Sequence, residues 1–149
     1  MPKIINHKEK KKQIIQYAFD SIVEKGVKGS TVRQIAKLAD MTPGQIRYYF
    51  PNHSELLNAV MSTVELKVRR RIEAIFKSEN LTTIDKAKAS LLTVLPLDKE
   101  RLADMEVWMA FRNDIHEYGQ STLDDGLDQL CNSILTLLKN DHLLKNNVN

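Results

Sequence analysis

Residues 30–58 contain three helix-start signals in close succession, and this crowding constrains the fold more than any other feature of the chain. Each signal is a capping box, in which a Thr or Asn side chain accepts a hydrogen bond from the backbone three residues on and a Gln or Glu reaches back. The boxes run from Thr31 to Gln34, from Thr42 to Gln45 and from Asn52 to Glu55. Two helices must therefore fit between the first box and the third, and both must be short.

The ends of these two helices follow from local chemistry. The first should begin at Val32, and Asp40 suits the left-handed position that ends a helix. The second should begin at Pro43, whose fixed φ fits the first helical position. It must stop by Tyr49, because Phe50 precedes a proline and is pushed out of the α region. A turn of about three residues then separates the helices, which is typical of a helix-turn-helix.

The segment 11–57 resembles the DNA-binding domain of the TetR family of bacterial regulators, especially its BetI-like branch. The resemblance rests on the stretches TVRQIAKLA and TPGQIRYYFPNHSELL. It implies a homodimer whose recognition helices meet a palindromic operator of double-stranded DNA, and a rear domain that binds an unknown small-molecule effector. Family members typically continue for two further helices, so we expect a chain that is short at its C-terminus.

Apolar residues recur at helical spacing through the rest of the chain, so the predicted fold class is all-α. We predict a three-helix DNA-binding domain over residues 1–58, joined by a long helix to a helical ligand-binding and dimerisation domain over residues 59–149, apparently truncated. The long helix should open at Asn52 and run for about 24 residues, or about 36 Å. Other helices are expected from Asn6 to Lys25, from Thr83 to Leu95, from Lys99 to Tyr118 and from Thr122 to Leu138. The predicted front core consists of Ile14, Ala18, Phe19, Ile22, Ile35, Leu38, Ile46 and Phe50.

The charge of the chain is unevenly distributed. Residues 1–76 carry 14 Lys and Arg against 7 Asp and Glu, whereas residues 77–149 carry 8 against 12. The front is therefore at +7 and the rear at −4, within an overall charge of +3. This asymmetry, together with the helix-turn-helix, predicts polyanion binding by the front half.

Base reading is expected from the helix that starts at Pro43. Gln45 can pair with adenine through both its amide atoms, and Arg33 on the preceding helix can read guanine. Pro43 and Gly44 have little side chain, so the backbone can approach the bases closely, and Arg47 or Tyr48 could add sequence contacts.

Phosphate contacts are expected from hydroxyl groups and helix starts. Thr42, Tyr48 and Tyr49 supply hydroxyls, and the helix start at Thr31 presents N–H groups that favour anions. The two tyrosines could instead pack in the core, and Tyr48 is the better candidate to face DNA. The chain departs from the family at Arg47, where tyrosine is common, and at His53, where lysine is usual; loss of that lysine should weaken a phosphate contact.

A second candidate site lies in the rear half. In the resembling family the helix expected over residues 99–118 borders a small-molecule cavity. Its side chains that could line a pocket are Met105, Trp108, Met109, Phe111 and Arg112. A stripe of Met and aromatic residues at helical spacing is also typical of an ordinary core, and both interpretations stay open.

Other classes of function find no support in the residues. The chain has no HExxH and no GxSxG, and none of its four His follows a Glu by three residues, so we expect no enzyme, no catalytic residue, no metal and no cofactor. The apolar run at residues 91–97 is too short to span a membrane. With a single Cys, we expect a cytoplasmic protein, nucleoid-associated when bound to DNA. The predicted function is a transcriptional repressor released by a ligand; the alternative is a shortened monomeric interaction module that pairs with a full-length relative.

Overall fold

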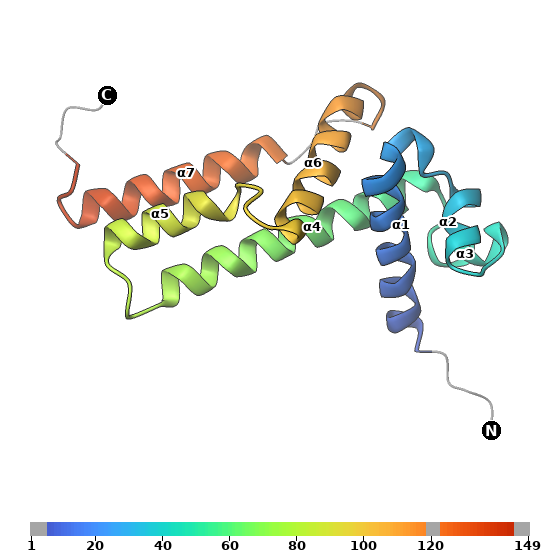
Figure 1. Ribbon diagram of the computed structural model, residues 1–149, viewed down its shortest axis with the longest axis horizontal. Coiled ribbons are helices and arrows are strands. Elements are labelled where there is room, and N and C mark those ends of the chain that lie inside the picture. Colours follow the sequence, from blue (N-terminus) through green and yellow to red (C-terminus); the bar gives the residue numbers. More distant parts are fainter. Residues whose placement is uncertain (1–5, 119–122, 145–149) are drawn as a thin grey trace.

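The structure, a computed structural model, describes residues 6–118 and 123–144, and the side chains of all of these except 112–118, 123–125 and 127. The described chain is all-helical and contains no strand. The long helix α4 forms the axis of the molecule; α2 and α3 lie at one end of it, α5 and α7 lie side by side along the other end, and α6 stands between them next to α1 (Figure 1). The helices are α1 (His7–Gly29), α2 (Val32–Leu38), α3 (Pro43–Tyr49), α4 (His53–Lys77), α5 (Thr83–Thr93), α6 (Lys99–Tyr118) and α7 (Leu123–Asn140).

The capping residues begin the helices where the sequence predicts. The Thr31 hydroxyl accepts from the backbone N–H of Gln34 at 3.3 Å, but the second half of this box is absent, since the Gln34 side chain accepts from Lys25 Nζ at 3.4 Å instead. The second box is complete, and the third has Asn52 as the N-cap of α4. Asp40 has φ 51°, the left-handed conformation expected after α2.

The link between α1 and α2 is tied to the start of α4. Gly26 has φ 71° and ψ 172°, so the first run of α1 ends at Lys25 as predicted, and a further turn after this kink extends α1 to Gly29. The buried Ser30 hydroxyl donates to the Gly26 carbonyl at 2.8 Å, and the Ser30 carbonyl accepts from His53 Nε2 at 2.6 Å. These contacts fix the orientation of α2 relative to α4.

The front core confirms seven of the eight predicted residues and corrects the eighth. Leu38 is 40% exposed, so its prediction as a core residue is wrong. Ile35 and Ala36 turn the inner face of α2 to the core, and Leu38 lies about 200° around the helix from Ala36, which brings it to the surface. The confirmed members are Ile14, Ala18, Phe19, Ile22, Ile35, Ile46 and Phe50, and Leu56, Leu57, Val60, Met61 and Val64 of α4 join them.

A second, smaller core holds the rear helices together. Ala87 of α5 and Leu130 and Ile134 of α7 are buried against partly buried side chains from α4. The two helices differ from their predicted ends, since α5 stops at Thr93 and α7 continues to Asn140. This arrangement leaves a hollow between α4, α6 and α7, described below.

Candidate nucleic-acid interface and pocket

Helix α3 is held by one side and exposed on the other. Ile46 is fully buried and Phe50, which caps the helix, is 6% exposed, so these two anchor α3 in the front core. The neighbouring side chains of Gln45, Arg47 and Tyr48 are exposed. A short helix that is rigidly anchored and turns its polar side to solvent can enter the major groove of a duplex.

The start of α3 combines close backbone approach with a complete cap. Thr42 Oγ1 accepts from the N–H of Gln45 at 3.2 Å, and Gln45 Oε1 accepts from the N–H of Thr42 at 2.8 Å. Pro43 and Gly44 between them are exposed. A Cβ atom added to Gly44 would meet only the Thr42 hydroxyl at 3.8 Å, an ordinary contact, so the fold itself does not require glycine there.

The side chain of Gln45 is therefore already hydrogen-bonded within the protein before any contact with a base. Its Oε1 is engaged with the backbone of Thr42, whereas the structure gives its Nε2 no hydrogen bond. A bidentate contact with adenine would require the same oxygen to accept a second hydrogen bond or to leave the cap.

Two aromatic residues at the end of α3 contact the start of α1. The Tyr48 hydroxyl lies 3.0 Å from His7 Nε2, and the His7 ring centroid lies 5.2 Å from that of Tyr48 and 4.7 Å from that of Tyr49. Tyr48 is 70% exposed, while Tyr49 is half-buried and packs against the core. Sequence reasoning missed His7, because nothing in a helical pattern shows that residues 7 and 48 meet.

The other predicted interface residues lie around α3. Thr31 and Arg33 at the start of α2 are exposed. His53 is half-buried, and its Nε2 donates to the Ser30 carbonyl, so this nitrogen is not available to a phosphate. Lys11 of α1 lies over the Phe50 ring, 5.4 Å from its centroid, which places a cation of α1 beside the end of α3.

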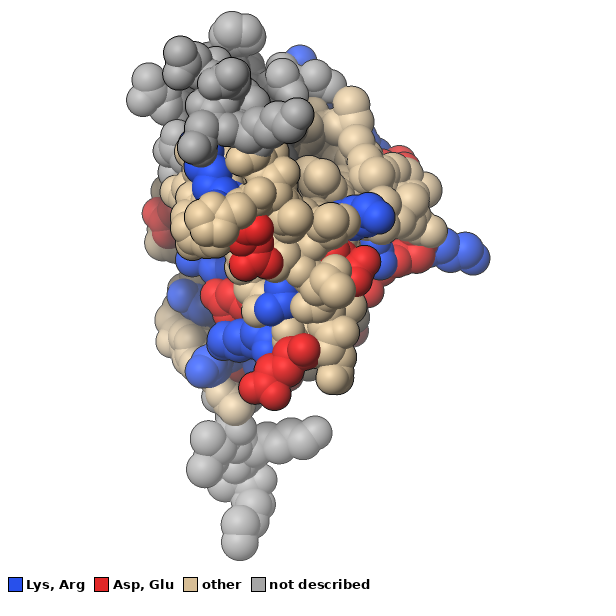
Figure 2. All heavy atoms as spheres, turned by 90° about the vertical axis from the view of Figure 1, so that its left-hand side faces the viewer, with Lys and Arg blue, Asp and Glu red and all other residues tan. Residues whose placement is uncertain are grey.

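The opposite end of the molecule has a different surface. Figure 2 views the end that carries α5 and α7, where positive and negative side chains are interspersed and no patch of one sign dominates the visible face. A mixed surface of this kind attracts a polyanion weakly.

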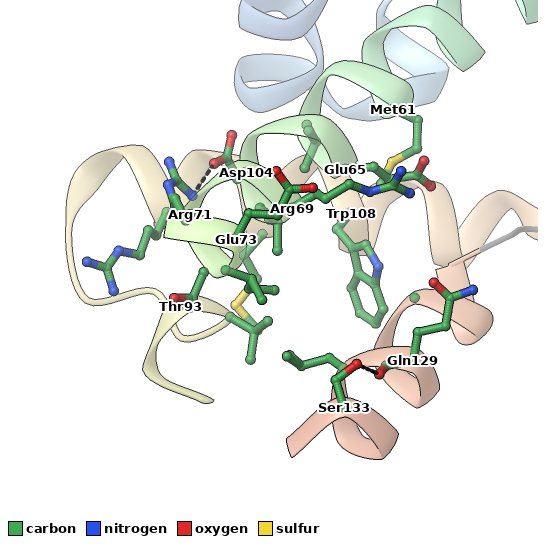
Figure 3. A pocket seen from close by; sticks show the side chains of 18 residues that line it. Met61, Glu65, Arg69, Arg71, Glu73, Thr93, Asp104, Trp108, Gln129 and Ser133 are labelled. Atoms are coloured by element: carbon green, nitrogen blue, oxygen red, sulfur yellow. Dashed lines mark hydrogen bonds and ion pairs between the residues drawn. The ribbon is translucent and has the colours of Figure 1, made fainter. Parts of the chain in front are cut away.

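A cavity of about 720 Å³ opens between α4, α6 and α7 and the end of α5. The exposed surface of its wall is mainly apolar, although half of the lining residues are charged or polar, and the Trp108 indole points into the hollow above Gln129 and Ser133 of α7 (Figure 3). Arg69 and Glu65 lie at its edge. The size and the lining are typical of a site for a small organic molecule.

Only some of the side chains predicted for this pocket line the cavity. Met105 and Trp108 line the cavity, but Met109 is half exposed and Phe111 packs against the front core, so neither belongs to its wall. Neighbouring helical residues point about 100° apart, which turns Met109 away from the face of Trp108. The side chain of Arg112 lies outside the described residues. Helix α4 supplies more of the lining residues than any other helix, although the sequence predicts it only as the link between the two domains.

A buried carboxylate joins the pocket to the front core. Asp104, 4% exposed, accepts from Lys67 Nζ at 3.2 Å and from the Arg71 guanidinium at 3.1 Å, and Arg71 also binds the exposed Glu100 at 2.8 Å. The ammonium group of Lys67 lies 4.8 Å from the ring centroid of Phe19 on α1. One group of side chains therefore connects α1, α4 and α6.

Sites of other kinds are not found among the residues that the structure describes. No three His, Cys, Asp or Glu side chains in this part of the chain come together as metal ligands would. No helix here combines the length and the apolar character needed to cross a bilayer. Cys131 is exposed.

Comparison with known sequences identifies relatives of this chain. The profile described as "Bacterial regulatory proteins, tetR family" matches residues 14–60. The regulator PksA of Bacillus subtilis (strain 168), described as an HTH-type transcriptional regulator, is 34% identical over 153 residues, which cover 99% of this chain and 72% of PksA. The HTH-type regulator BetI of Klebsiella pneumoniae (strain 342) is 28% identical over 115 residues, covering 74% of this chain and 57% of BetI.

Solved structures share the fold at lower identity. A transcriptional regulator from Rhodococcus sp. Rha1 superposes with a TM-score of 0.67 at 21% identity, over 88% of this chain and 66% of that one. A structure described as the molecular basis for control of antibiotic production by bacterial hormones gives a TM-score of 0.79 at 17% identity, over 95% and 75% of the two chains. These neighbours establish the arrangement of the helices.

Proposed function

The chain belongs to the TetR family of bacterial transcriptional regulators, which are DNA-binding proteins and not enzymes, and we propose that it is a repressor that leaves its operator when a small molecule binds. In this proposal residues 1–58 form the DNA-binding domain, and residues 59–149 bind the ligand and hold two copies together. The homodimer would present its two copies of α3 to successive major grooves of a palindromic site, about 34–36 Å apart.

The outward face of α3 is the observation that carries the proposal. Ile46 and Phe50 hold the helix in the core, so the exposed Gln45 and Arg47 are presented by a rigid support. Gly44 strengthens the argument, because the fold has room for a side chain there and glycine lowers helix stability relative to alanine. Glycine at that place suits a partner that must approach the backbone closely.

Distinct roles follow for the residues around this helix. Gln45, Arg33 and Arg47 would contact base edges, and close backbone approach at Pro43 and Gly44 would admit them. The residues proposed to meet phosphates are Thr31, Thr42, Tyr48 and, less directly, Tyr49 and His53.

The cavity supports the ligand-responsive part of the proposal. Met105 and Trp108 line it, and the same helix sends Val107, which is fully buried, into the front core with α1. A molecule that moved Trp108 would therefore displace a side chain packed in the front core. Release would require that the molecule bind two global states unequally.

The experiment that tests DNA binding is selection of bound sequences from a random duplex pool at low and at moderate salt. We expect a palindromic sequence to be enriched, because a symmetric dimer reads two half-sites. Arg47→Ala should weaken binding and reduce the slope of log K against log[salt] by about one if Arg47 meets a phosphate, or relax one base preference if it meets a base.

The matched control is Lys88→Ala, an exposed cation on α5 far from α3, which should leave both affinity and salt slope at the parent values. Salt-sensitive binding without sequence preference would contradict a specific operator. A monomer by light scattering that enriches single half-sites or none would instead favour the alternative function, a module that pairs with a full-length relative.

A further inference from the structure

The first residue of α1 and the last two residues of α3 form a cluster of three rings. His7 contacts Tyr48 and Tyr49, and the two tyrosine rings meet edge to face with centroids 5.1 Å apart. Aromatic pairs at these separations attract each other beyond their buried area. The cluster therefore joins the beginning of the described chain to the helix that faces solvent.

The hydrogen bond between His7 and Tyr48 decides whether the tyrosine hydroxyl can donate its proton to a partner. The distance between His7 Nε2 and the Tyr48 hydroxyl is 3.0 Å. If Nε2 lacks a proton, it accepts from the hydroxyl and the phenol proton is used within the protein. If Nε2 carries a proton, it donates to the phenol oxygen, and the phenol proton is free to reach an acceptor outside.

The protonation of His7 therefore affects the donor capacity of Tyr48. A neutral imidazole populates both arrangements, because its proton can sit on either nitrogen. An imidazolium carries protons on both nitrogens and always donates. Protonation thus removes the arrangement that competes with an outside acceptor, and it adds a positive charge.

The charges near the three rings bear on whether DNA binding favours the protonated form of His7. The two elements that meet here carry Lys8, Lys10, Lys11 and Arg47 as cations, and Glu9 lies 3.7 Å from Lys12. DNA phosphates favour the protonated form of His7, because they attract an imidazolium and need hydrogen-bond donors.

We propose that His7 is a positioning residue of the DNA interface, which donates from Nε2 to Tyr48 so that the tyrosine hydroxyl can donate to a phosphate, and that DNA binding is accompanied by proton uptake at His7. The inference rests on the proposed function of α3. It assigns to His7 a part in binding that the helical spacing of the sequence does not indicate.

The sign of the pH dependence follows by linkage. If the bound state holds the proton more tightly, affinity rises as pH falls through the range in which an imidazole titrates, and it levels off once the free protein is also protonated. The slope cannot exceed one proton per protomer, or about tenfold in affinity per pH unit and protomer. We expect the total gain in DNA affinity to be about three- to tenfold per protomer.

The test measures affinity at fixed ionic strength from about pH 5 to about pH 8, the range of imidazole titration. The probe is the duplex enriched from the random pool, or the unselected pool if none is enriched. His7→Gln can still donate from Nε2 but cannot titrate, so it should keep at least the parent affinity at high pH and lose the His7 part of the slope. His7→Phe keeps a ring against the tyrosines but donates nothing, so it should bind more weakly than His7→Gln at every pH. Tyr48→Phe should also lose the His7-dependent slope.

Two controls separate this effect from others. Titration of His53 is common to the parent and to His7→Gln, so it cancels in their difference. His142→Gln, at the end of the chain that carries α7, should show the slope of the parent. Urea midpoints of all variants show whether a loss of binding is only a loss of folding.

The outcomes distinguish the two proposals. If the parent binds neither the pool nor any selected duplex, the proposed function fails. If the parent binds DNA but His7→Gln shows the same pH slope, or if His7→Phe binds as well as His7→Gln, then DNA binding stands and the role of His7 is overturned. An increase in DNA affinity at low pH that disappears in both His7→Gln and Tyr48→Phe supports the inference.

Discussion

At the scale of single residues, three of the side chains proposed to contact DNA are also hydrogen-bonded within the protein. Gln45 accepts from the backbone of Thr42, Tyr48 shares a hydrogen bond with His7, and His53 donates to the Ser30 carbonyl. Such bonds hold a side chain in place before binding, which reduces the rotamer freedom lost in a complex. They also occupy donors and acceptors, so a DNA contact made through one of these bonded atoms must share or replace an internal bond.

Gly44→Ala should separate stability from binding. Alanine removes the entropy penalty of glycine in a helix, and the nearest atom to the new Cβ lies 3.8 Å away. The free energy of unfolding should therefore rise by up to about 1 kcal/mol. The same methyl group would stand on the face proposed to meet the bases, so affinity for the selected duplex should fall. Urea unfolding and a binding titration measure the two effects.

Gly126 provides the matched comparison for that change. It lies in α7, and a Cβ there meets nothing within 4 Å. Gly126→Ala should stabilise the protein similarly and leave DNA affinity unchanged. Equal DNA affinity for Gly44→Ala and the parent would mean that the start of α3 does not come close to the duplex.

Two substitutions at Gln45 divide its roles in capping and in base reading. Glutamate preserves the capping box but has no amide donor, whereas alanine loses both functions. Gln45→Ala should relax the preference at one base pair at a cost of about 1–3 kcal/mol in binding and should also lower stability. Gln45→Glu should keep the stability and still lose the adenine preference. Selection from the random pool with each variant gives the answer, and an unchanged base preference in both would exclude Gln45 from base reading.

At the scale of elements, α6 is the piece that belongs to both halves of the molecule. Val107 is packed in the front core, while Met105 and Trp108 line the cavity on another side of the same helix. Asp104 fixes α6 to α4 through Lys67 and Arg71. The position of this helix is therefore set by a buried ionic contact together with apolar packing.

Asp104→Asn should test how strongly that contact holds α6. Its side chain is only 5% exposed, and the change leaves two cations without their shared carboxylate. Because Lys67 and Arg71 are themselves 33% and 26% exposed, we expect a loss of about 2–3 kcal/mol in the free energy of unfolding, at the lower end for a buried ion pair. Urea denaturation measures it. Glu100→Gln removes a carboxylate that is 66% exposed from the same cluster and should cost less than about 1 kcal/mol, so equal losses would contradict the assignment.

The elements also show which parts of the structure the sequence could predict. The starts of α2, α3 and α4 were predicted to the residue, because a capping side chain and the N–H it accepts from are neighbours in the chain. The exposure of Leu38 was not, since it depends on which side of a two-turn helix the rest of the core covers. The pairing of His7 with Tyr48 could not be predicted either, because the two residues meet only through the angle between α1 and α3.

The same limit applies to the pocket. The family resemblance predicted a cavity beside the helix of residues 99–118, and of the five side chains named for it the structure puts Met105 and Trp108 in the wall. The sequence could not show that α4 supplies more of the lining than any other helix, nor that Phe111 turns to the front core. A cavity is defined by helices that are distant in sequence, so its wall cannot be derived from one helix at a time.

At the scale of the whole molecule, the cavity and the face of α3 are linked by packed helices. The wall helix α6 contacts α1, and α1 begins with His7, which touches the end of α3. Interiors are close-packed, so a displacement of α6 must be absorbed by the elements that touch it. If a ligand uses this connection, its binding and that of DNA must influence each other reciprocally.

The single tryptophan of the chain makes this reciprocity measurable. Trp108 points into the cavity, so a small apolar molecule that enters should change its fluorescence, and no other tryptophan contributes to the signal. Among molecules that change the emission, an effector should lower the affinity for the selected duplex by about 5- to 150-fold, the usual range of allosteric coupling. Saturation with that duplex should then lower the affinity of the protein for the small molecule by the same factor.

Val68→Phe tests whether the cavity is the place of binding. Val68 lies in the wall, and a larger side chain there fills part of the hollow without adding a tryptophan. The variant should bind DNA as the parent does, but neither its fluorescence nor its DNA affinity should respond to the molecule. Coupling that survives in Val68→Phe would place the effector elsewhere. A molecule that changes the emission of the parent and leaves DNA affinity untouched would occupy the cavity without distinguishing the two states, and the proposed release by that molecule would be wrong.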